Sequence, residues 1–262
     1  MDRGLLSEPR LLEASRAFVC ARVITYQDPA ESAFLKSLGS SATGGLLNTA
    51  FAILAPDGKT VLTGTGRSPR QVFRGSEEVT LDHLLATMEE IRNRYEPRKS
   101  SPPPALPYLA DLRIALNVAS CDDQPLVIVK AKSPSRRKSL ERLLAPLAWS
   151  PDLRGRFAFA HASDTESDSE MLDAITGAPA SDAILVVQPG VYGTRGTVIA
   201  STTRLSKDAV RNVLERGKTA YRSMEKDRGT VRAGKRRGLR WEEDTTERAP
   251  DRDNTRRARR GG

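Results

Sequence analysis

The feature that most constrains this chain is a proline-rich segment near its middle. Residues Glu96 to Pro107 read EPRKSSPPPALP, and five of these twelve are proline. Proline fixes φ and lacks a backbone N–H donor, so the segment can form neither a helix interior nor a central strand. A stiff, extended linker is therefore expected over residues 98–107. It separates a unit of residues 1–97 from a second unit that begins at residue 108.

The positive charge of the chain is concentrated at its end. The 262 residues carry a formal net charge of +9, and the stretch from Lys218 to Gly262 holds 15 Lys and Arg against 8 Asp and Glu. The preceding residues, with 27 basic and 25 acidic side chains, are nearly neutral. Few apolar residues follow residue 221, so burial there cannot offset the entropy of ordering. We expect the second unit to end at residue 221 and residues 222–262 to be a disordered basic tail.

Basic patches in this tail are candidate contacts for a polyanion. Lys235, Arg236, Arg237 and Arg240 could bind phosphates, and Trp241 could stack on a base. The interspersed acids favour the alternative of a solvated tail that binds nothing. Nucleic acid or an anionic surface is thus one candidate partner, and an unidentified protein is another.

Patterning in the first unit predicts helices and strands in alternation. A short helix end, a strand-like run, a proline-initiated helix, a hairpin around a Pro-Asp-Gly turn and an amphipathic helix follow one another. In order, these are expected around residues 7–16, 18–26, 28–38, 48–67 and 80–91.

The second unit repeats this order after an additional strand and helix. A short mixed segment over residues 109–120 precedes an apolar strand, a helix capped by Ser133 with Pro134 in its first turn, a strand, a helix ended by Gly177, a hairpin, and a helix capped by Ser206. The six elements after the mixed segment are expected, in chain order, around residues 124–132, 133–149, 156–163, 166–177, 182–203 and 205–217. The duplicated order predicts an α/β fold, with a mixed sheet flanked by helices.

This order resembles the thioredoxin fold, and parts of the chain resemble a group of bacterial thioredoxin-family proteins. In the first unit the resemblance rests on FVCARVITYQDPAESAFLKSL and NTAFAILAPDGKTVLTGTGRSP. In the second it rests on RIALNVASCDDQPLVIVKA and LAPLAWSPDLRGRF, so that about 200 residues are covered. It implies tandem thioredoxin-like units, of which the first is truncated at its N-terminal side.

The resemblance does not extend to the redox motif. A thioredoxin carries CxxC at the start of the helix after its first strand, where the helix N-terminus stabilises a thiolate. The second unit has Ser133, Pro134, Ser135 and Arg136 there, and hydroxyls cannot exchange disulfides. The first unit lacks that position. The family's cis-proline is also replaced, by Asn48 in the first unit and by Ser181-Asp182 in the second.

The two cysteines are weak catalytic candidates. Cys20 falls within the predicted strand and is expected to be a small buried residue. Cys121 precedes the next strand, beside Asp122 and Asp123, whose charges would raise the pKa of a thiol. With two histidines and no CxxC pair, neither a metal site nor a cofactor is expected.

These observations favour a redox-inactive thioredoxin-like binding or scaffold protein, and they do not predict an enzyme. One alternative is a thiol–disulfide oxidoreductase that uses a lone thiol or a CxxC in a segment upstream of Met1. Another is nucleic-acid association through the tail. The N-terminus has no apolar run of signal-peptide length, so we expect a cytoplasmic protein, or an exported one if the true start lies upstream.

Overall fold

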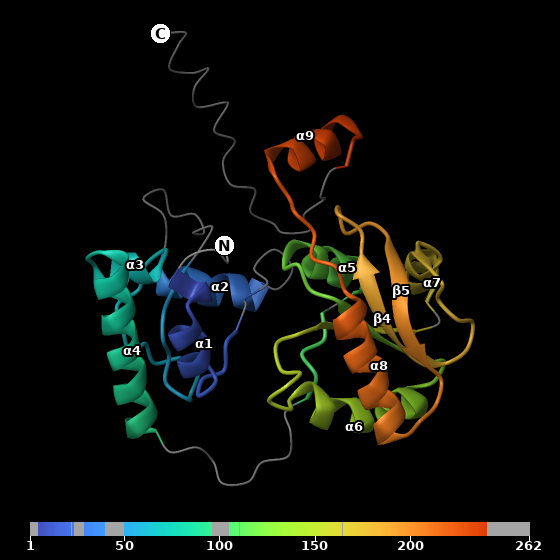
Figure 1. Ribbon diagram of the computed structural model, residues 1–262, viewed down its shortest axis with the longest axis horizontal. Helices are drawn as coiled ribbons and strands as arrows, with labels where there is room; N and C mark the ends of the chain where they lie inside the picture. Colours follow the sequence, from blue (N-terminus) through green and yellow to red (C-terminus); the bar gives the residue numbers. More distant parts are fainter. Residues whose placement is uncertain are drawn as a thin grey trace. The chain divides into compact units, whose positions relative to one another are not determined.

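The computed structural model describes residues 5–21, 23, 29–39, 50–95, 105–109, 111–163 and 165–239. The chain divides into two compact units. The described residues of the first unit end at Tyr95, and those of the second begin at Ala105. Figure 1 labels the helices and strands of both units.

The second unit is built on a five-stranded mixed sheet in the order β2-β1-β4-β5-β3. Strand β1 pairs in parallel with β2 and antiparallel with β4, while β5 is antiparallel to β4 and parallel to the short β3. The bounds are β1 Leu126–Lys130, β2 Ala158–Ala162, β3 Ile175–Thr176, β4 Ala183–Pro189 and β5 Gly196–Thr202. The predicted mixed sheet is confirmed in this unit.

Two pairs of helices cover the two faces of this sheet. Helices α6 and α8 contact each other and pack on one face, whereas α5 and α7 pack on the other. Figure 1 shows α8 lying along β4 and β5. The bounds are α5 Leu112–Cys121, α6 Pro134–Ala148, α7 Glu166–Asp173 and α8 Lys207–Ala220. Residues 112–121, which the sequence suggested to be a mixed segment, thus form a regular helix.

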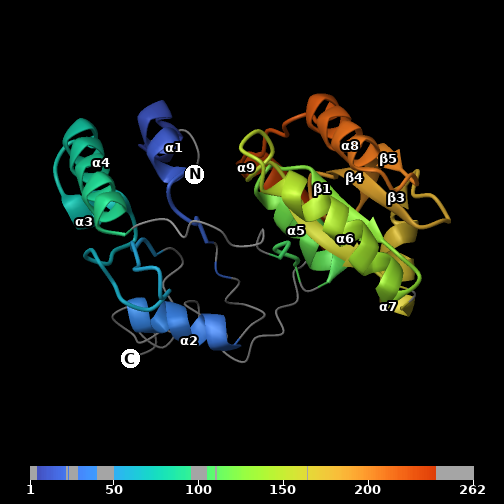
Figure 2. The same ribbon diagram turned by 90° about the horizontal axis from the view of Figure 1, so that it is seen from below.

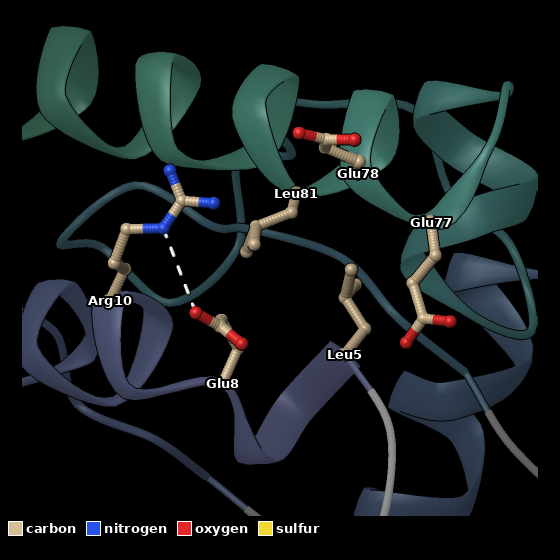
Figure 3. Close-up of a pocket in the computed structure, with 6 residues that line it drawn as sticks. All are labelled: Leu5, Glu8, Arg10, Glu77, Glu78 and Leu81. Atoms are coloured by element: carbon tan, nitrogen blue, oxygen red, sulfur yellow. Dashed lines mark ion pairs between the residues drawn. The ribbon is translucent and has the colours of Figure 1, made fainter.

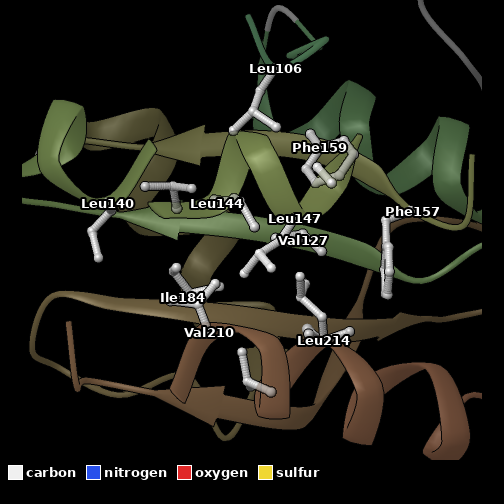
Figure 4. Close-up of a cluster of buried hydrophobic side chains, with 14 of the residues drawn as sticks. Leu106, Val127, Leu140, Leu144, Leu147, Phe157, Phe159, Ile184, Val210 and Leu214 are labelled. Atoms are coloured by element: carbon white, nitrogen blue, oxygen red, sulfur yellow. The ribbon is translucent and has the colours of Figure 1, made fainter. Parts of the chain in front are cut away.

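The apolar core explains why β1 is hydrophobic along its whole length. Val127 faces the α6–α8 side and Ile128 faces the α5–α7 side, so neither face of the strand meets water. Figure 4 shows Leu144 and Leu214 of the covering helices gathered with Val127 and Ile184 of the sheet. Each of these four side chains is fully buried.

The end of the proline-rich segment belongs to the second unit. Leu106 is buried in the core beneath α6, and Tyr108 forms an isolated parallel bridge with Phe159 of β2. Residues 105–107 were expected to be linker. They pack on the unit instead, because Leu106 provides apolar surface that can be buried next to the sheet edge.

The first unit consists of a small helical cluster beside an irregular hairpin. Leu11 of α1 packs with Leu81, Leu84 and Met88 of α4, and α3 also contacts α4. Figure 2 shows α1 and α4 side by side. The elements are η1 Leu5–Ser7, α1 Pro9–Ser15, α2 Pro29–Leu38, α3 Pro69–Phe73 and α4 Glu77–Arg94.

The strands predicted for the first unit are largely absent from its described residues. Residues 18–21 and 23 form no strand, and Val19 is 91% exposed. The hairpin keeps two isolated bridges, Phe51 with Gly66 and Leu54 with Val61. A β-branched run forms a strand only where a neighbouring strand satisfies its backbone. The predicted sheet of a first thioredoxin-like copy is therefore not seen in this part of the chain.

Residues 222–239, which we expected to be disordered, are ordered and include α9, Arg228–Arg236. The prediction considered the apolar content of the segment alone and missed its polar contacts with the second unit. The remainder of the expected tail, residues 240–262, lies outside the described residues. Across the described ranges, no helix is long and apolar enough to span a membrane.

Candidate functional site

The first turn of α6, directly after β1, is the position at which the thioredoxin resemblance would place a CxxC motif. Ser133 is the N-cap, and its Oγ accepts a hydrogen bond from the Arg136 amide at 3.3 Å. The Ser133 and Ser135 hydroxyls lie 3.1 Å apart. Pro134 occupies the first turn, where a missing N–H costs nothing. The predicted placement of these residues at a helix start is confirmed.

Asp182 joins this turn from the residue before β4. Its Oδ1 accepts a hydrogen bond from the Lys132 amide at 3.0 Å, and its Oδ2 lies 3.5 Å from Nε of Arg136. Sequence reasoning noted Ser181-Asp182 and Ser133–Arg136 separately and did not foresee this contact. No cis peptide bond occurs among the described residues.

This arrangement has polar groups but no activated nucleophile. The Ser133 hydroxyl caps the helix, and the Asp182 carboxylate is engaged by Lys132 and Arg136. A serine nucleophile needs an adjacent general base that can accept its proton. The turn can therefore form hydrogen bonds and ion pairs, but it lacks the two thiols that disulfide exchange requires.

Both cysteines are free and exposed. Cys20 was expected to be buried within a strand, but it lies outside any strand and faces solvent. Cys121 is the last residue of α5, and its Sγ donates to Oδ1 of Asn117 at 3.7 Å. The cysteines belong to different units.

A polar cluster around Asp123 holds the C-terminal segment, which we define as residues 221–239. Asp123 has φ +53, and its carboxylate accepts hydrogen bonds from the Tyr221 hydroxyl at 2.9 Å, the Met224 amide at 2.8 Å and the Ser223 hydroxyl. These contacts tie the turn after α5 to the chain that follows α8.

The pKa values of this cluster reflect its contacts. Burial raises the pKa of Asp123, but hydrogen bonds from Ser223, Met224 and Tyr221 outweigh burial. Together with the charge of Lys226, they leave the pKa of Asp123 below its usual value. Burial, and then the hydrogen bond to Asp123, raise the pKa of Tyr221 well above its usual value.

A second anchor of the C-terminal segment lies in the last turn of α5, three residues before Asp123. Nζ of Lys226 donates to the Ser120 hydroxyl at 2.7 Å and also to the Ser120 carbonyl oxygen. The Ser120 hydroxyl in turn lies 2.9 Å from the carbonyl oxygen of Gly190. Ser120 is buried, so it connects the C-terminal segment and the turn between β4 and β5 through one side chain.

The turn between β4 and β5 provides the seat for α9. Gly193 has φ +63, and a Cβ there would lie 2.5 Å from the Asn117 Cα, so this close packing on α5 requires glycine. The neighbouring Tyr192 faces α9, and its hydroxyl donates to the Thr230 carbonyl oxygen at 3.2 Å. Gly234 of α9 is buried against the Tyr192 ring, where an added Cβ would lie 2.9 Å from Cε1.

The predicted polyanion contacts divide into three groups in the structure. Lys235 and Arg236 are exposed in the last turn of α9. The Arg237 guanidinium lies 5.7 Å from the centre of the Tyr192 ring, a cation–π distance. Arg240 and Trp241 lie outside the described residues.

Sequence reasoning missed two further exposed cations of α9, Arg228 and Arg232. With Lys235 they occupy positions i, i+4 and i+7, a spacing that places side chains on one face of a helix. That spacing was the available signal, and it was overlooked because the segment was interpreted as disordered.

The described part of the first unit contains a pocket of about 320 Å³ between the N-terminal residues and α4. Figure 3 shows its ion pair, in which Nε of Arg10 lies 3.7 Å from Oε1 of Glu8. Two of its acids belong to the first turn of α4, where carboxylates favour the helix dipole. The lining is Leu5, Glu8, Arg10, Glu77, Glu78 and Leu81, which includes no Ser, Thr, Cys, Lys or His side chain.

In the described ranges, no group of three or more His, Cys, Asp and Glu residues could hold a metal ion. A comparison with known proteins finds no matching family model, no matching curated sequence and no matching solved structure. The site must therefore be interpreted from its own geometry.

Proposed function

We propose that the second unit is a thioredoxin-like scaffold that carries out no dithiol chemistry. The strand order β2-β1-β4-β5 supports the proposal, with β1 parallel to β2 and antiparallel to β4. The pairing of α6 with α8 on one face and α5 with α7 on the other supports it further. The same arrangement of strands and helices is expected for a thioredoxin-like unit.

The observation that carries the proposal is the first turn of α6. Ser133 and Arg136 occupy the two positions, three residues apart, at which a redox-active relative would hold its thiols. Ser133 uses its hydroxyl as a helix cap, and Arg136 pairs with Asp182. Both positions are thus engaged in contacts that stabilise the helix start instead of exchanging disulfides.

The proposed scaffold role is to hold binding segments in a fixed orientation. The turn between β4 and β5 is packed on α5 through Gly193 and Ser120. Tyr192 on that turn then receives α9. A rigid sheet that fixes a loop, which in turn fixes a helix, is suited to presenting that helix to a partner.

The competing proposal is an oxidoreductase that acts through a single thiol, and the exposure of both cysteines favours testing it. The test is the reduction of insulin by dithiothreitol, measured with the wild-type chain, Cys20→Ser and Cys121→Ser. We expect the wild-type rate to equal the rate without protein. Turnover by the wild-type chain that disappears in either serine variant would contradict the scaffold proposal and identify the responsible thiol.

A further inference from the structure

Helix α9 carries a stripe of positive charge along one face. Arg228, Arg232, Lys235 and Arg236 are all exposed, and they recur at positions i, i+4, i+7 and i+8. At about 100° per residue, these four side chains lie on one side of the helix. We call them the cationic stripe. No acidic residue occurs between Arg228 and Leu239 to interrupt it.

The opposite side of α9 is fixed to the second unit. Thr230 and Gly234 meet Tyr192, through a 3.2 Å hydrogen bond and a close ring contact. The capping box of Asp227 and Thr230 fixes the helix start, with the Thr230 amide 2.7 Å from Oδ1 of Asp227. Because the docked side and the stripe lie on different faces, the stripe is directed away from Tyr192.

The charges of the stripe are not neutralised within the described chain. Several cations elsewhere in the described chain are paired with acids, as in Arg94 with Glu90 and Arg211 with Asp152. None of the four stripe residues lies within 4.0 Å of a carboxylate in the described ranges. Four unpaired cations on one helix face are suited to a ligand with regularly spaced negative charges.

We propose that the cationic stripe of α9 binds the phosphate backbone of duplex nucleic acid. Nine helical residues span about 13 Å, close to the roughly 12 Å width of the major groove of B-DNA. The stripe is long enough to contact several phosphates at once. This inference goes beyond the scaffold role and does not depend on the unit being thioredoxin-like.

Among the described residues, the side chains around the stripe favour a duplex over a single strand. Binding of single strands relies on aromatic side chains that stack on unpaired bases. Among the described residues of the C-terminal segment the only aromatic side chain is Tyr221, which is half-buried and bonded to Asp123. Tyr192 is half-buried too and already contacts Gly234 and Arg237.

The apolar content of α9 argues against a membrane surface as the ligand. A helix that lies in a membrane interface needs a broad apolar face to insert. The single large apolar side chain of α9 is Val231, and the face opposite the stripe is occupied by Tyr192. The charge can thus attract a bilayer, but the helix has little apolar surface with which to enter it.

The test is the binding of the full chain to a fluorescein-labelled DNA duplex of about 20 base pairs, measured by anisotropy between 50 and 200 mM salt. Each phosphate contact contributes about −0.9 to the slope of log K against log salt. In Arg228→Gln/Arg232→Gln/Lys235→Gln/Arg236→Gln we expect the slope to lose about three to four units. Affinity at 50 mM salt should fall at least about tenfold.

A matched control removes the same number of charges from α6 and α8. Lys138, Arg142, Lys207 and Arg216 are exposed and form no ion pair with another described residue. Their fourfold replacement by Gln gives the same net charge as the stripe variant. We expect the control to change the salt slope by less than one unit, because these cations lie outside the proposed contact.

Three outcomes would overturn the proposal. The first is an equal loss of duplex affinity in the control, which would mean that net charge alone drives binding. The second is single-stranded DNA bound at least as tightly as the duplex. The third is no duplex binding, with stripe-dependent binding to vesicles of phosphatidylcholine and phosphatidylserine, which would assign the stripe to a lipid surface. Circular dichroism of each variant verifies that the fold is kept.

Discussion

Helix α4 of the first unit and helix α6 of the second begin in the same way. Ser76 and Ser133 each accept a hydrogen bond from the amide three residues later, at 3.3 Å in both helices. Their surroundings differ, since α4 packs on two helices whereas α6 packs on a sheet that α8 also covers. A local signal therefore determines the start of a helix. A sheet and its core, in contrast, form only where distant segments of the chain meet.

The largest expected difference between the units is the cost of the same core truncation. Leu144 of α6 and Leu84 of α4 are both fully buried, but Leu144 belongs to the larger core cluster. We expect Leu144→Ala to destabilise its unit by about 4 kcal/mol and Leu84→Ala by about 2 kcal/mol, because the smaller cluster can relax around the cavity. Hydrogen exchange measured on peptides from α6 and α4 reports each unit separately. Equal costs would refute the distinction.

The next effect concerns the anchoring of the C-terminal segment to the second unit. Asp123→Ala removes three hydrogen bonds, and we expect exchange protection over residues 221–227 to fall by about 1–3 kcal/mol. Asp123→Asn is the matched control, because asparagine tolerates the positive φ and still accepts hydrogen bonds. The loss of exchange protection in Asp123→Asn should be smaller than in Asp123→Ala. Unchanged protection in Asp123→Ala would show that the segment is held by other contacts.

The same cluster should respond to pH at both extremes. Because the pKa of Asp123 is lowered in the fold, its contribution to stability is fully present above pH 3.8, the usual pKa of an aspartate. That contribution is lost as pH falls through the lower folded-state pKa. Because the pKa of Tyr221 is raised in the fold, its contribution to stability is fully present below pH 10, the usual pKa of a tyrosine. That contribution is lost as pH rises through the higher folded-state pKa. The NMR signal of the Met224 amide should therefore shift below about pH 3.8 and above pH 10. In Asp123→Asn the acid shift should disappear.

The smallest expected effect is the one that both units share. Ser133→Ala and Ser76→Ala each remove a helix cap, and we expect each to cost about 1 kcal/mol. The costs should be similar because a cap acts within its own first turn. Chemical denaturation, followed by hydrogen exchange in peptides from α4 and α6, measures the two stability costs. A difference of more than about 1 kcal/mol would mean that the caps also have tertiary roles.

Sequence patterns predicted the starts of α6 and α8 correctly because the causes of these starts are local. Ser133 with Pro134, and likewise Ser206, satisfy backbone amides within three residues of themselves. The run after Phe18 was misjudged because strand formation depends on a partner, and Val19 is exposed. The helix over residues 112–121 was missed although Asp111 caps it, with the Ile114 amide 2.7 Å from Oδ1.

The candidate site was predictable only in part. The turn from Ser133 to Arg136 was placed correctly, but its contact with Asp182 joins residues 46 or more positions apart. The order of α9 depends on Tyr192, which lies 42 positions before Gly234 and has no local signature. Such contacts follow from the sheet topology, which brings the β4–β5 turn and the C-terminal segment to the same end of α5.

The proposed scaffold is tested most directly by introducing two thiols at the start of α6, where a thioredoxin-like unit would hold them. Ser133→Cys/Arg136→Cys creates Cys-Pro-Ser-Cys at the start of α6, and Ser206→Cys/Ala209→Cys places the same spacing at the equally capped start of α8. Each variant loses one serine cap, so their stabilities should be comparable. We predict that the α6 pair reduces insulin faster than the α8 pair. Equal rates, or an inactive α6 pair in a folded protein, would contradict a thioredoxin-like second unit.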